Sequence, residues 1–289
     1  MQKERIPSDP NQSFRLFSWE ESLENIHLHS GHGESTPLSG LGNVWHYHPE
    51  IELTFFTQGE GIHYIGDDIS AFESPELVLL GSNLPHHWDV DHSSGYCIQF
   101  SFTPSSPLAG LHESSDLTNL LKQAERGLLF SKNCQQDILP LIEECIHLDP
   151  ILRLTHFLQI LHRLSKARAT ALSSYLPQAA NQSKSPQIKN AIQFIVENAT
   201  REDLSLSHVL DHVSMSRATF SRQFQKALGL SYTNFIQSIR LETARRLLTT
   251  TNQSITEIAY ASGFSNLSHF NALFRKRWNM APSSLRKKL

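Results

Sequence analysis

The last part of the chain contains one apolar pattern twice, and this duplication limits what the chain can fold into. Segments 206–228 and 255–278 each predict a short helix, a turn and a second helix, because their apolar residues recur at steps of three and four and share one helical face. The residues that open each second helix are instead small and polar. A helix with a buried back and a short polar front can enter the major groove of DNA. The pattern predicts two helix-turn-helix units in tandem. The alternative is a helical bundle that binds nothing.

Charge divides the chain into two parts. The whole sequence has 25 Lys and Arg against 28 Asp and Glu, a net charge of −3. Residues 186–289 hold 14 basic and 6 acidic residues, a net charge of +8, whereas residues 1–185 hold 11 and 22, a net charge of −11. A basic C-terminal part suits contact with DNA phosphates, and the acidic part argues against a second DNA surface there.

The residues around the two units predict the rest of a helical domain over 186–289. Helices are expected over 186–198 and 232–250, where apolar positions again share one face. Gly229 is placed to end the first recognition helix, and Gly263 to make the turn of the second unit. Pro282 suits the first turn of a last short helix.

At these positions the sequence closely resembles the DNA-binding domain of the AraC/XylS transcriptional regulators. Two positions depart from the family pattern, with Asn279 where glycine is usual and Leu285 where an aromatic residue is common. Asn tolerates the left-handed backbone conformation, so we expect no change of fold. The matching residues are Ile258, Ala259, Tyr260, Ala261, Ser262, Gly263, Phe264, Ser268, His269, Phe270, Phe274, Arg275, Lys276, Ala281 and Pro282.

The resemblance implies how the domain meets DNA. The long helix over 232–250 is expected to hold the two recognition helices about 34 Å apart, one DNA turn, on one face of the duplex. Arg222 is expected to contact a guanine or a phosphate, and Ser216, Thr219 and Ser268 to contact phosphates. The implied partners are double-stranded DNA and RNA polymerase. The residues assigned to the DNA surface are Ser216, Arg217, Ala218, Thr219, Ser221, Arg222, Asn266, Leu267, Ser268, His269, Asn271 and Ala272.

Residues 14–110 predict a small all-β barrel or jelly roll. Short runs of branched and aromatic residues, such as 52–57, 61–65, 77–80 and 96–102, alternate with clusters of Gly, Asp and Ser that mark turns. Two segments resemble the signature motifs of cupin barrels. The second motif covers 81–88, with His86 at its histidine position. The first has the spacing G-x5-H-x-H-x3-E-x6-G and consists of Gly40, His46, His48, Glu52 and Gly59.

The histidines and the glutamate of these motifs form a candidate metal site. His46, His48 and Glu52 have even offsets, so on a strand they share one face. Together with His86 they would offer three imidazoles and one carboxylate to Zn²⁺, Mn²⁺, Fe²⁺ or Ni²⁺. The alternative is a barrel without metal, in which the same residues contact a polar ligand or hydrogen-bond within the barrel.

A small-molecule effector, such as a sugar or a small acid, is expected inside the barrel. Aromatic rings would stack on it, and polar side-chain tips would hydrogen-bond to it. The residues assigned to this site are Trp45, Tyr47, His63, Tyr64 and Trp88.

Residues 111–172 predict helices, with apolar faces over 117–128, 138–145 and 154–164. Leu128 is placed on the first of these faces. The resemblance to AraC-type regulators implies that this segment forms a homodimer, and the alternative is that it only caps the barrel. Residues 173–185 are expected to be a flexible linker.

Other features favour a cytoplasmic protein without a membrane segment. No apolar run approaches the roughly 20 residues of a membrane span, and the polar N-terminus does not resemble a signal peptide. Cys97, Cys134 and Cys145 show no paired spacing and are expected to be reduced.

These observations predict a two-domain protein, with an N-terminal cupin-like barrel and following helices and a C-terminal all-α tandem helix-turn-helix domain. The expected function is a ligand-responsive, sequence-specific transcriptional regulator, an activator by family resemblance, and not an enzyme. One alternative is a metal-dependent cupin isomerase or dioxygenase joined to a DNA-binding domain. Another is a regulator without effector that uses the barrel only to dimerise.

Overall fold

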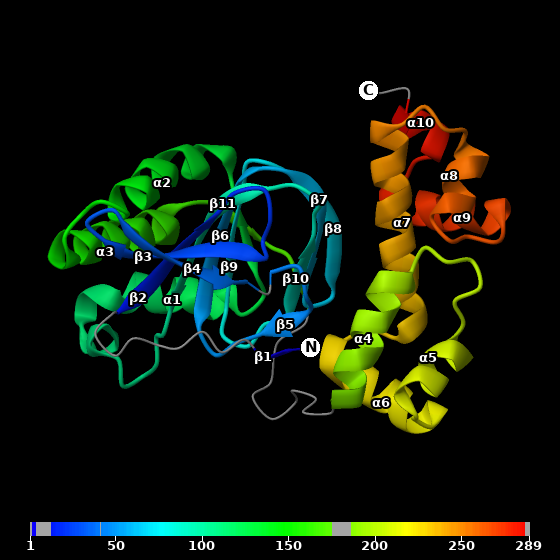
Figure 1. Cartoon of the computed structure of the whole chain (residues 1–289), viewed down its shortest axis with the longest axis horizontal. Coiled ribbons are helices and arrows are strands. Elements are labelled where there is room, and N and C mark those ends of the chain that lie inside the picture. Colours follow the sequence, from blue (N-terminus) through cyan, green and yellow to red (C-terminus); the bar gives the residue numbers. More distant parts are fainter. Residues whose placement is uncertain (1, 4–12, 41, 175–185, 287–289) are drawn as a thin grey trace. The chain divides into compact units, whose positions relative to one another are not determined.

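The computed structural model describes residues 2–3, 13–40, 42–174 and 186–286, which separate into two compact units (Figure 1). The N-terminal unit consists mainly of strands followed by helices, and the C-terminal unit consists of helices. The predicted architecture, a cupin-like barrel with following helices and an all-α helix-turn-helix domain, is confirmed. No helix among the described residues is long and apolar enough to cross a bilayer.

Two sheets form the N-terminal unit. Most neighbouring strands pair antiparallel, while β1 and β5 pair parallel. The smaller sheet has the order β1 (Gln2–Lys3), β5 (His46–Tyr47), β10 (His86–Asp89), β7 (Glu60–Ile65) and β8 (Asp68–Glu73). The larger sheet has the order β13 (Ala169–Ala171), β12 (Leu128–Phe130), β9 (Glu76–Leu80), β6 (Ile51–Gln58), β11 (Ser94–Phe100), β2 (Phe14–Trp19), β3 (Asn25–Gly31) and β4 (Glu34–Ser39).

The central strands of the larger sheet are buried on both faces. Alternation along β6 directs Leu53 and Phe55 into a cluster shared with helices, and Phe56 into a second cluster with Ile65 and Trp88 of the smaller sheet. Helices therefore cover one face of this sheet and the smaller sheet covers the other. This two-sided burial explains why the run 77–80 on β9 is continuously apolar.

Three helices provide that cover, and one prediction about them is wrong. They are α1 (Ser115–Ala124), α2 (Lys132–Cys145) and α3 (Pro150–Lys166), preceded by two 3-10 turns, Pro107–Gly110 and His112–Ser114. Leu128, expected on a helical face, lies instead on β12 opposite Leu79 of β9. Gly127, with a φ of +66°, reverses the chain after α1. The apolar residues that follow gain backbone hydrogen bonds at a sheet edge, which helical periodicity cannot reveal.

The helices leave some apolar side chains uncovered. On α3, Ile151, Leu152 and Leu158 are 68%, 44% and 36% exposed. The three helices do cover the larger sheet, and dimerisation through this segment, which the sequence favoured over capping alone, stays a prediction.

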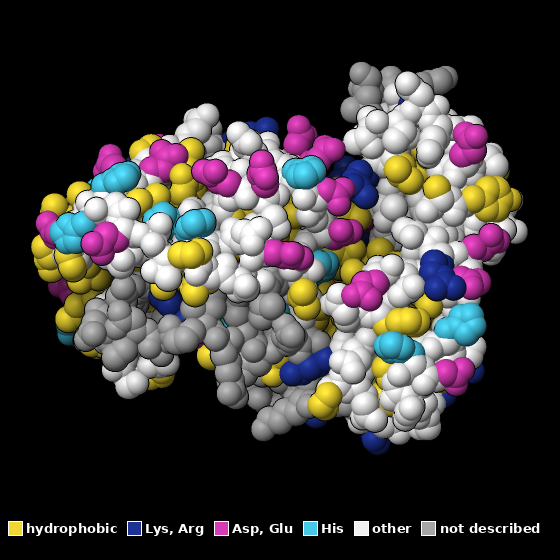
Figure 2. All heavy atoms as spheres, in the orientation of Figure 1, with side chains coloured by type: hydrophobic (Ala, Val, Ile, Leu, Met, Phe, Trp, Pro, Cys, Tyr) yellow, Lys and Arg dark blue, Asp and Glu magenta, His cyan; other side chains and the backbone are white. Residues whose placement is uncertain are grey.

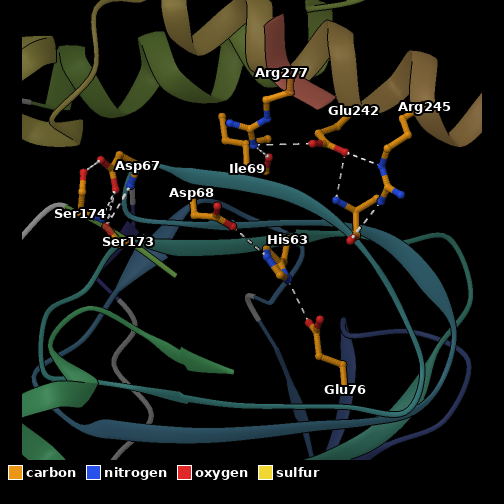
Figure 3. Close-up of polar contacts among 11 residues, drawn as sticks. His63, Asp67, Asp68, Ile69, Glu76, Ser173, Ser174, Glu242, Arg245 and Arg277 are labelled. Carbon is orange, nitrogen blue, oxygen red and sulfur yellow. Dashed lines mark hydrogen bonds and ion pairs between the residues drawn. The ribbon is translucent and has the colours of Figure 1, made fainter. Parts of the chain in front are cut away.

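The predicted linker begins with two anchored residues. Ser173 and Ser174 both hydrogen-bond to Asp67, in the turn between β7 and β8, and Ser173 Oγ lies 2.5 Å from Asp67 Oδ1 (Figure 3). Ser173 is fully buried. The remaining linker positions, 175–185, lie outside the described residues.

The C-terminal unit consists of seven helices among its described residues. Local signals set their ends: Ser231 caps α7 by accepting from Asn234 N, and Ser254 forms a reciprocal capping box with Glu257 at the start of α8. The helices are α4 (Pro186–Asn198), α5 (Leu206–Val213), α6 (Arg217–Leu228), α7 (Tyr232–Thr250), α8 (Ile255–Ala261), α9 (Leu267–Trp278) and α10 (Pro282–Arg286). Both predicted helix-turn-helix units and the long connecting helix are confirmed.

The predicted chain reversals of this unit are also confirmed. Gly229 ends α6 with a φ of +73°, and Gly263 has a φ of +88° between α8 and α9. Asn279 ends α9 with a φ of +54°, so it takes the left-handed conformation expected of it.

Candidate functional site

Four buried side chains meet between the two sheets of the barrel. His46 on β5 lies directly opposite His86 on β10, Glu52 lies on β6 of the other sheet, and His48 follows β5. One possible ligand atom from each lies within 4.8 Å of the other three. All four residues are at most 4% exposed. The structure therefore brings together the four residues predicted as metal ligands.

Backbone carbonyls orient the three imidazole rings of this centre. A carbonyl oxygen only accepts, so each Nδ1 donates to it and Nε2 is the ring nitrogen that can serve as a ligand atom. Histidine ligands of metals usually make such a second hydrogen bond. The three Nδ1–O distances are 2.7 Å for His46 to Val44, 3.1 Å for His48 to Glu50 and 2.8 Å for His86 to Leu84.

Glu52 accepts hydrogen bonds at both carboxylate oxygens. Thr54 Oγ1 donates to Oε1 over 2.5 Å. Gln99 Nε2 donates to Oε2 over 3.0 Å, and His48 Nε2 lies 2.9 Å from the same oxygen. Nε2 of His86 lies 3.7 Å from Oε1 and makes no hydrogen bond to any described residue. A buried ring nitrogen with no partner, beside a carboxylate, fits a ligand position.

The protonation states of the centre also suit a cation. Burial by itself raises the pKa of Glu52, but the imidazoles of His86 and His48 hold this pKa well below its usual value. Burial lowers the pKa of His86 to about 4. At neutral pH the centre therefore contains an ionised carboxylate and a neutral imidazole, the forms in which these groups bind metals.

Gln99 and Arg15 extend this network, and neither is among the site residues predicted from the sequence. In register, Gln99 on β11 lies between Arg15 on β2 and Glu52 on β6. Arg15 Nη2 lies 2.9 Å from Gln99 Oε1 and 3.2 Å from Glu50 Oε1. A guanidinium group only donates, so the Gln99 oxygen faces Arg15 and its nitrogen faces Glu52. The sequence signal that could have identified them is a polar residue at an inward-facing position of an otherwise apolar strand.

A small cavity adjoins the centre. Its volume is about 50 Å³. Polar groups of the centre line one part of it and apolar side chains line the rest. The lining residues are Phe17, Trp19, Leu23, Ile26, Gly40, Gly42, His46, Glu52, Thr54, Trp88, Cys97 and Gln99.

The residues predicted to bind an effector are divided between different places. Trp88 lines the cavity. Trp45 and Tyr64 instead contact each other and His87, with ring centroids 5.0 to 6.5 Å apart, and so occupy the other face of the small sheet. Tyr47 follows His46 directly on β5 and points to that face too. The structure does not bring these residues together, and their ligand role stays a prediction.

The fifth of these residues, His63, is held by two carboxylates (Figure 3). Its Nδ1 donates to Glu76 Oε1 and its Nε2 to Asp68 Oδ2, each over 3.0 Å, and the residue is 2% exposed. Burial lowers the pKa of His63, but Glu76 and Asp68 raise it more, to about 10. His63 is therefore a buried imidazolium that connects β7 to β9 of the other sheet.

The twelve residues assigned to the DNA surface lie at the starts of α6 and α9. Thr219, Leu267 and Asn271 are partly exposed and the other nine are exposed. Ser216 and Asn266 also cap these helices, since their side-chain oxygens accept from Thr219 N and His269 N. Leu267 packs against the core of the second unit, so part of its side chain faces away from the exposed surface.

Buried aromatic residues support the backs of both recognition helices. Phe220 and Phe224 of α6, and Phe270 and Phe274 of α9, are each 0% exposed. Glu242 of α7 lies 2.9 Å from Arg245 Nε and 3.7 Å from Arg277 Nη2 of α9, which connects the long helix to the second recognition helix (Figure 3).

Acidic side chains gather on the face of the N-terminal unit seen in Figure 2, in keeping with its negative charge.

Comparison with known proteins gives the same assignment. A family described as "Helix-turn-helix domain" matches residues 209–288. The transcriptional activator RhaS of Pectobacterium carotovorum subsp. carotovorum is 27% identical over 251 residues, 83% of this chain and 86% of that protein. RhaS of Escherichia coli is 35% identical over 91 residues, 32% of this chain and 33% of that protein. A solved C-terminal domain of AraT, a response regulator from Geobacillus stearothermophilus, is 30% identical over 37% of this chain and 89% of that domain, with a TM-score of 0.36. The helix-turn-helix match and the RhaS relatives, together with the two observed units, show a DNA-binding transcriptional regulator of the AraC/XylS type rather than an enzyme.

Proposed function

We propose that this chain is a ligand-responsive transcriptional activator whose barrel controls sequence-specific DNA binding. The observation that carries the proposal is the buried cluster of His46, His48, Glu52 and His86 in a chain that also holds a tandem DNA-binding domain. The related RhaS proteins are named as transcriptional activators, which supports activation as the sign of regulation. A ligand alters promoter occupancy if it binds the DNA-competent arrangement more tightly than the other arrangements.

DNA recognition is assigned to the starts of α6 and α9. Arg217 and Arg222 are exposed there, and short side chains around them allow the helices to approach base edges. Because phosphate contacts position the protein and base contacts select the sequence, both arginines matter for affinity and Arg222 is assigned to base reading. Dimerisation through the 111–172 segment doubles these contacts on repeated half-sites, and RNA polymerase is the partner that an activator requires.

We assign a divalent metal ion, Zn²⁺, Mn²⁺, Fe²⁺ or Ni²⁺, to the four-residue centre. The donor set of three imidazole nitrogens and one carboxylate fits such ions, and His86 Nε2 lacks a hydrogen bond to any described residue. Bound there, such an ion would supply positive charge to a ligand in the adjoining cavity. The residues of this chain orient the imidazoles, keep Glu52 ionised and exclude bulk water.

The regulator is tested by incubating the full-length protein with fragments of its own genome at about 150 mM salt, which suppresses loose phosphate binding. Enrichment of a few promoters with repeated half-sites is expected. Uniform retention of fragments, with or without metal and candidate ligands, would refute sequence-specific regulation.

The metal is tested by elemental analysis of purified wild-type protein and His48→Ala. Wild-type protein is expected to contain close to one ion per chain, and the variant to contain none. His92→Ala is the matched control, because His92 is exposed and lies outside the centre. Wild-type protein that stays free of metal after metal-replete expression would refute the assignment and leave the barrel as a metal-free sensor or a dimerisation unit.

A further inference from the structure

The two recognition helices share one design. Both α6 and α9 have 12 residues, and a side chain caps the first turn of each, that of Ser216 in α6 and that of Asn266 in α9. Each helix ends at a left-handed residue, Gly229 in α6 and Asn279 in α9. The two helices can therefore be compared position by position.

Their buried faces correspond as well. Each helix presents two fully buried phenylalanines four positions apart, Phe220 and Phe224 in α6, Phe270 and Phe274 in α9. Successive residues turn by about 100° around a helix axis, so the residue midway between the two rings points directly away from the buried face. That residue is Arg222 in α6 and Ala272 in α9, and both are exposed. A helix with its back on its own domain presents this position to the base edges of a groove.

At this position the two helices offer different chemistry. Arg222 carries a guanidinium group, and its side chain makes no ion pair or hydrogen bond to any residue that the structure describes. Arginine reads guanine through two hydrogen bonds, to O6 and N7. Ala272 offers only a methyl group, which suits apolar contact with the methyl group of thymine and makes no hydrogen bond.

The other positions at the start of α9 do not replace the missing guanidinium group. Leu267 stands where α6 has Arg217, and it packs against the core of the second unit. His269 lies edge-on to the ring of Phe264, with ring centroids 6.4 Å apart. An imidazole directs its two nitrogens apart, so it cannot form the paired bonds that a guanidinium group makes to guanine.

The cations of α9 lie at its other end. Arg275, Lys276 and Arg277 occupy its last turn. Recognition helices contact base edges with their N-terminal residues, and cations elsewhere on them contact phosphates. Phosphate contacts carry no sequence information directly, so these cations add affinity without adding a preference for guanine.

One amide at the start of α9 is available to read a base. The side-chain oxygen of Asn266 is engaged as the helix cap, 2.9 Å from His269 N. Asn271, next to Ala272, is partly exposed, and its side chain makes no hydrogen bond to any residue in the described part of the chain. Asparagine reads adenine through two hydrogen bonds, to N6 and N7.

We infer that the two helices read different base compositions: α6 reads a subsite that contains guanine, through Arg222, and α9 reads a subsite of A·T pairs, through Asn271 and Ala272. This inference rests on the proposed function, because it requires sequence-specific DNA binding. It adds the composition of the DNA site and the residues that determine it.

The test selects binding sites for the full-length protein from random-sequence duplex DNA at about 150 mM salt, over a range of protein concentrations. Wild-type protein is expected to enrich a site of two parts with centres about 10 base pairs apart. One part should require a guanine, and the other should show preferences for adenine and thymine only.

Substitutions assign each part to its helix. Arg222→Ala should remove the guanine requirement from the first part and leave the second unchanged. Ala272→Arg should create a guanine preference of about tenfold in the second part only, because it restores the guanidinium group at the equivalent position. Asn271→Ala should remove the adenine preference from the second part. Ala261→Arg, at an exposed position of α8, adds the same charge and is the matched control that should change neither preference.

The outcomes separate this inference from the proposed function. A guanine requirement in both parts of the wild-type site, a second part with no base preference, or equal effects of Ala272→Arg and Ala261→Arg would overturn the inference. In each case the enriched site would still support a sequence-specific regulator. The absence of any enriched sequence at every protein concentration would overturn both.

Discussion

Replacing His63 by glutamine should weaken the N-terminal unit by an amount that depends on pH. His63 is buried and donates to Glu76 and Asp68, each over 3.0 Å, and these carboxylates raise its pKa from 6.5 to about 10. At about 1.4 kcal/mol per pKa unit, this rise corresponds to about 5 kcal/mol of folding free energy. In the variant, the buried carboxylate of Glu76 and the partly buried carboxylate of Asp68 also lose the cation between them.

The raised pKa determines the sign of the pH dependence. A group that holds its proton more tightly in the folded state contributes its full stabilisation below its unfolded pKa, here about 6.5. That contribution is lost as pH rises through the folded pKa of about 10. The free-energy difference between wild type and His63→Gln should therefore be largest at pH 6 and shrink steadily toward pH 10.

Urea unfolding at pH 6, 8 and 10 measures this difference. Tryptophan fluorescence suits the assay, because three of the four tryptophans, Trp19, Trp45 and Trp88, lie in the N-terminal unit. His92→Gln, at an exposed position, is the control and should leave the free energy of unfolding almost unchanged at every pH. A difference that stays constant from pH 6 to pH 10 would show that His63 is not held as an imidazolium.

Three further predictions concern the DNA-binding unit. Arg222→Ala should cost about 1–3 kcal/mol of specific DNA binding and relax base preference at one position, measured by fluorescence anisotropy on an operator and its single-base variants. Gln225→Ala, exposed on the same helix, should change neither, and equal effects would remove Arg222 from base reading. Phe270→Ala should destabilise the second helix-turn-helix unit by about 3–5 kcal/mol and abolish its cooperative melting near physiological temperature, because the ring is fully buried. Calorimetry that shows a loss of stability below about 1 kcal/mol would contradict this packing role. Ser254→Ala should cost about 1 kcal/mol in chemical denaturation, since it removes one half of the capping box, and an unchanged midpoint would argue against that cap.

The helical unit could be predicted closely because its signals are local. The ends of α7, the caps Ser231 and Ser254, and the left-handed residues Gly229 and Asn279 all depend on residues within a few positions along the chain. Apolar side chains at helical spacing then identify the buried face. The motif of His46, His48 and Glu52 is local in the same sense.

The parts that were missed depend on strand pairing. Leu128 fits a helical apolar pattern in the sequence, but in the folded structure it lies on a strand that pairs with β9. The positions of Trp45, Tyr47 and Tyr64 follow from the face that each strand turns inward, and a shift by one residue exchanges the two faces.

The sequence by itself determined the class of this protein, its tandem DNA-binding helices and the four residues of its candidate metal centre. Only the tertiary structure decided that Gln99, 84 residues from Arg15 in the chain, bonds to both Arg15 and Glu52, and that two carboxylates enclose His63. Helix periodicity and capping are set by neighbours in the chain, whereas these contacts arise from the register of distant strands. Buried polar groups must find partners across such pairings, and no local pattern specifies which partner they find.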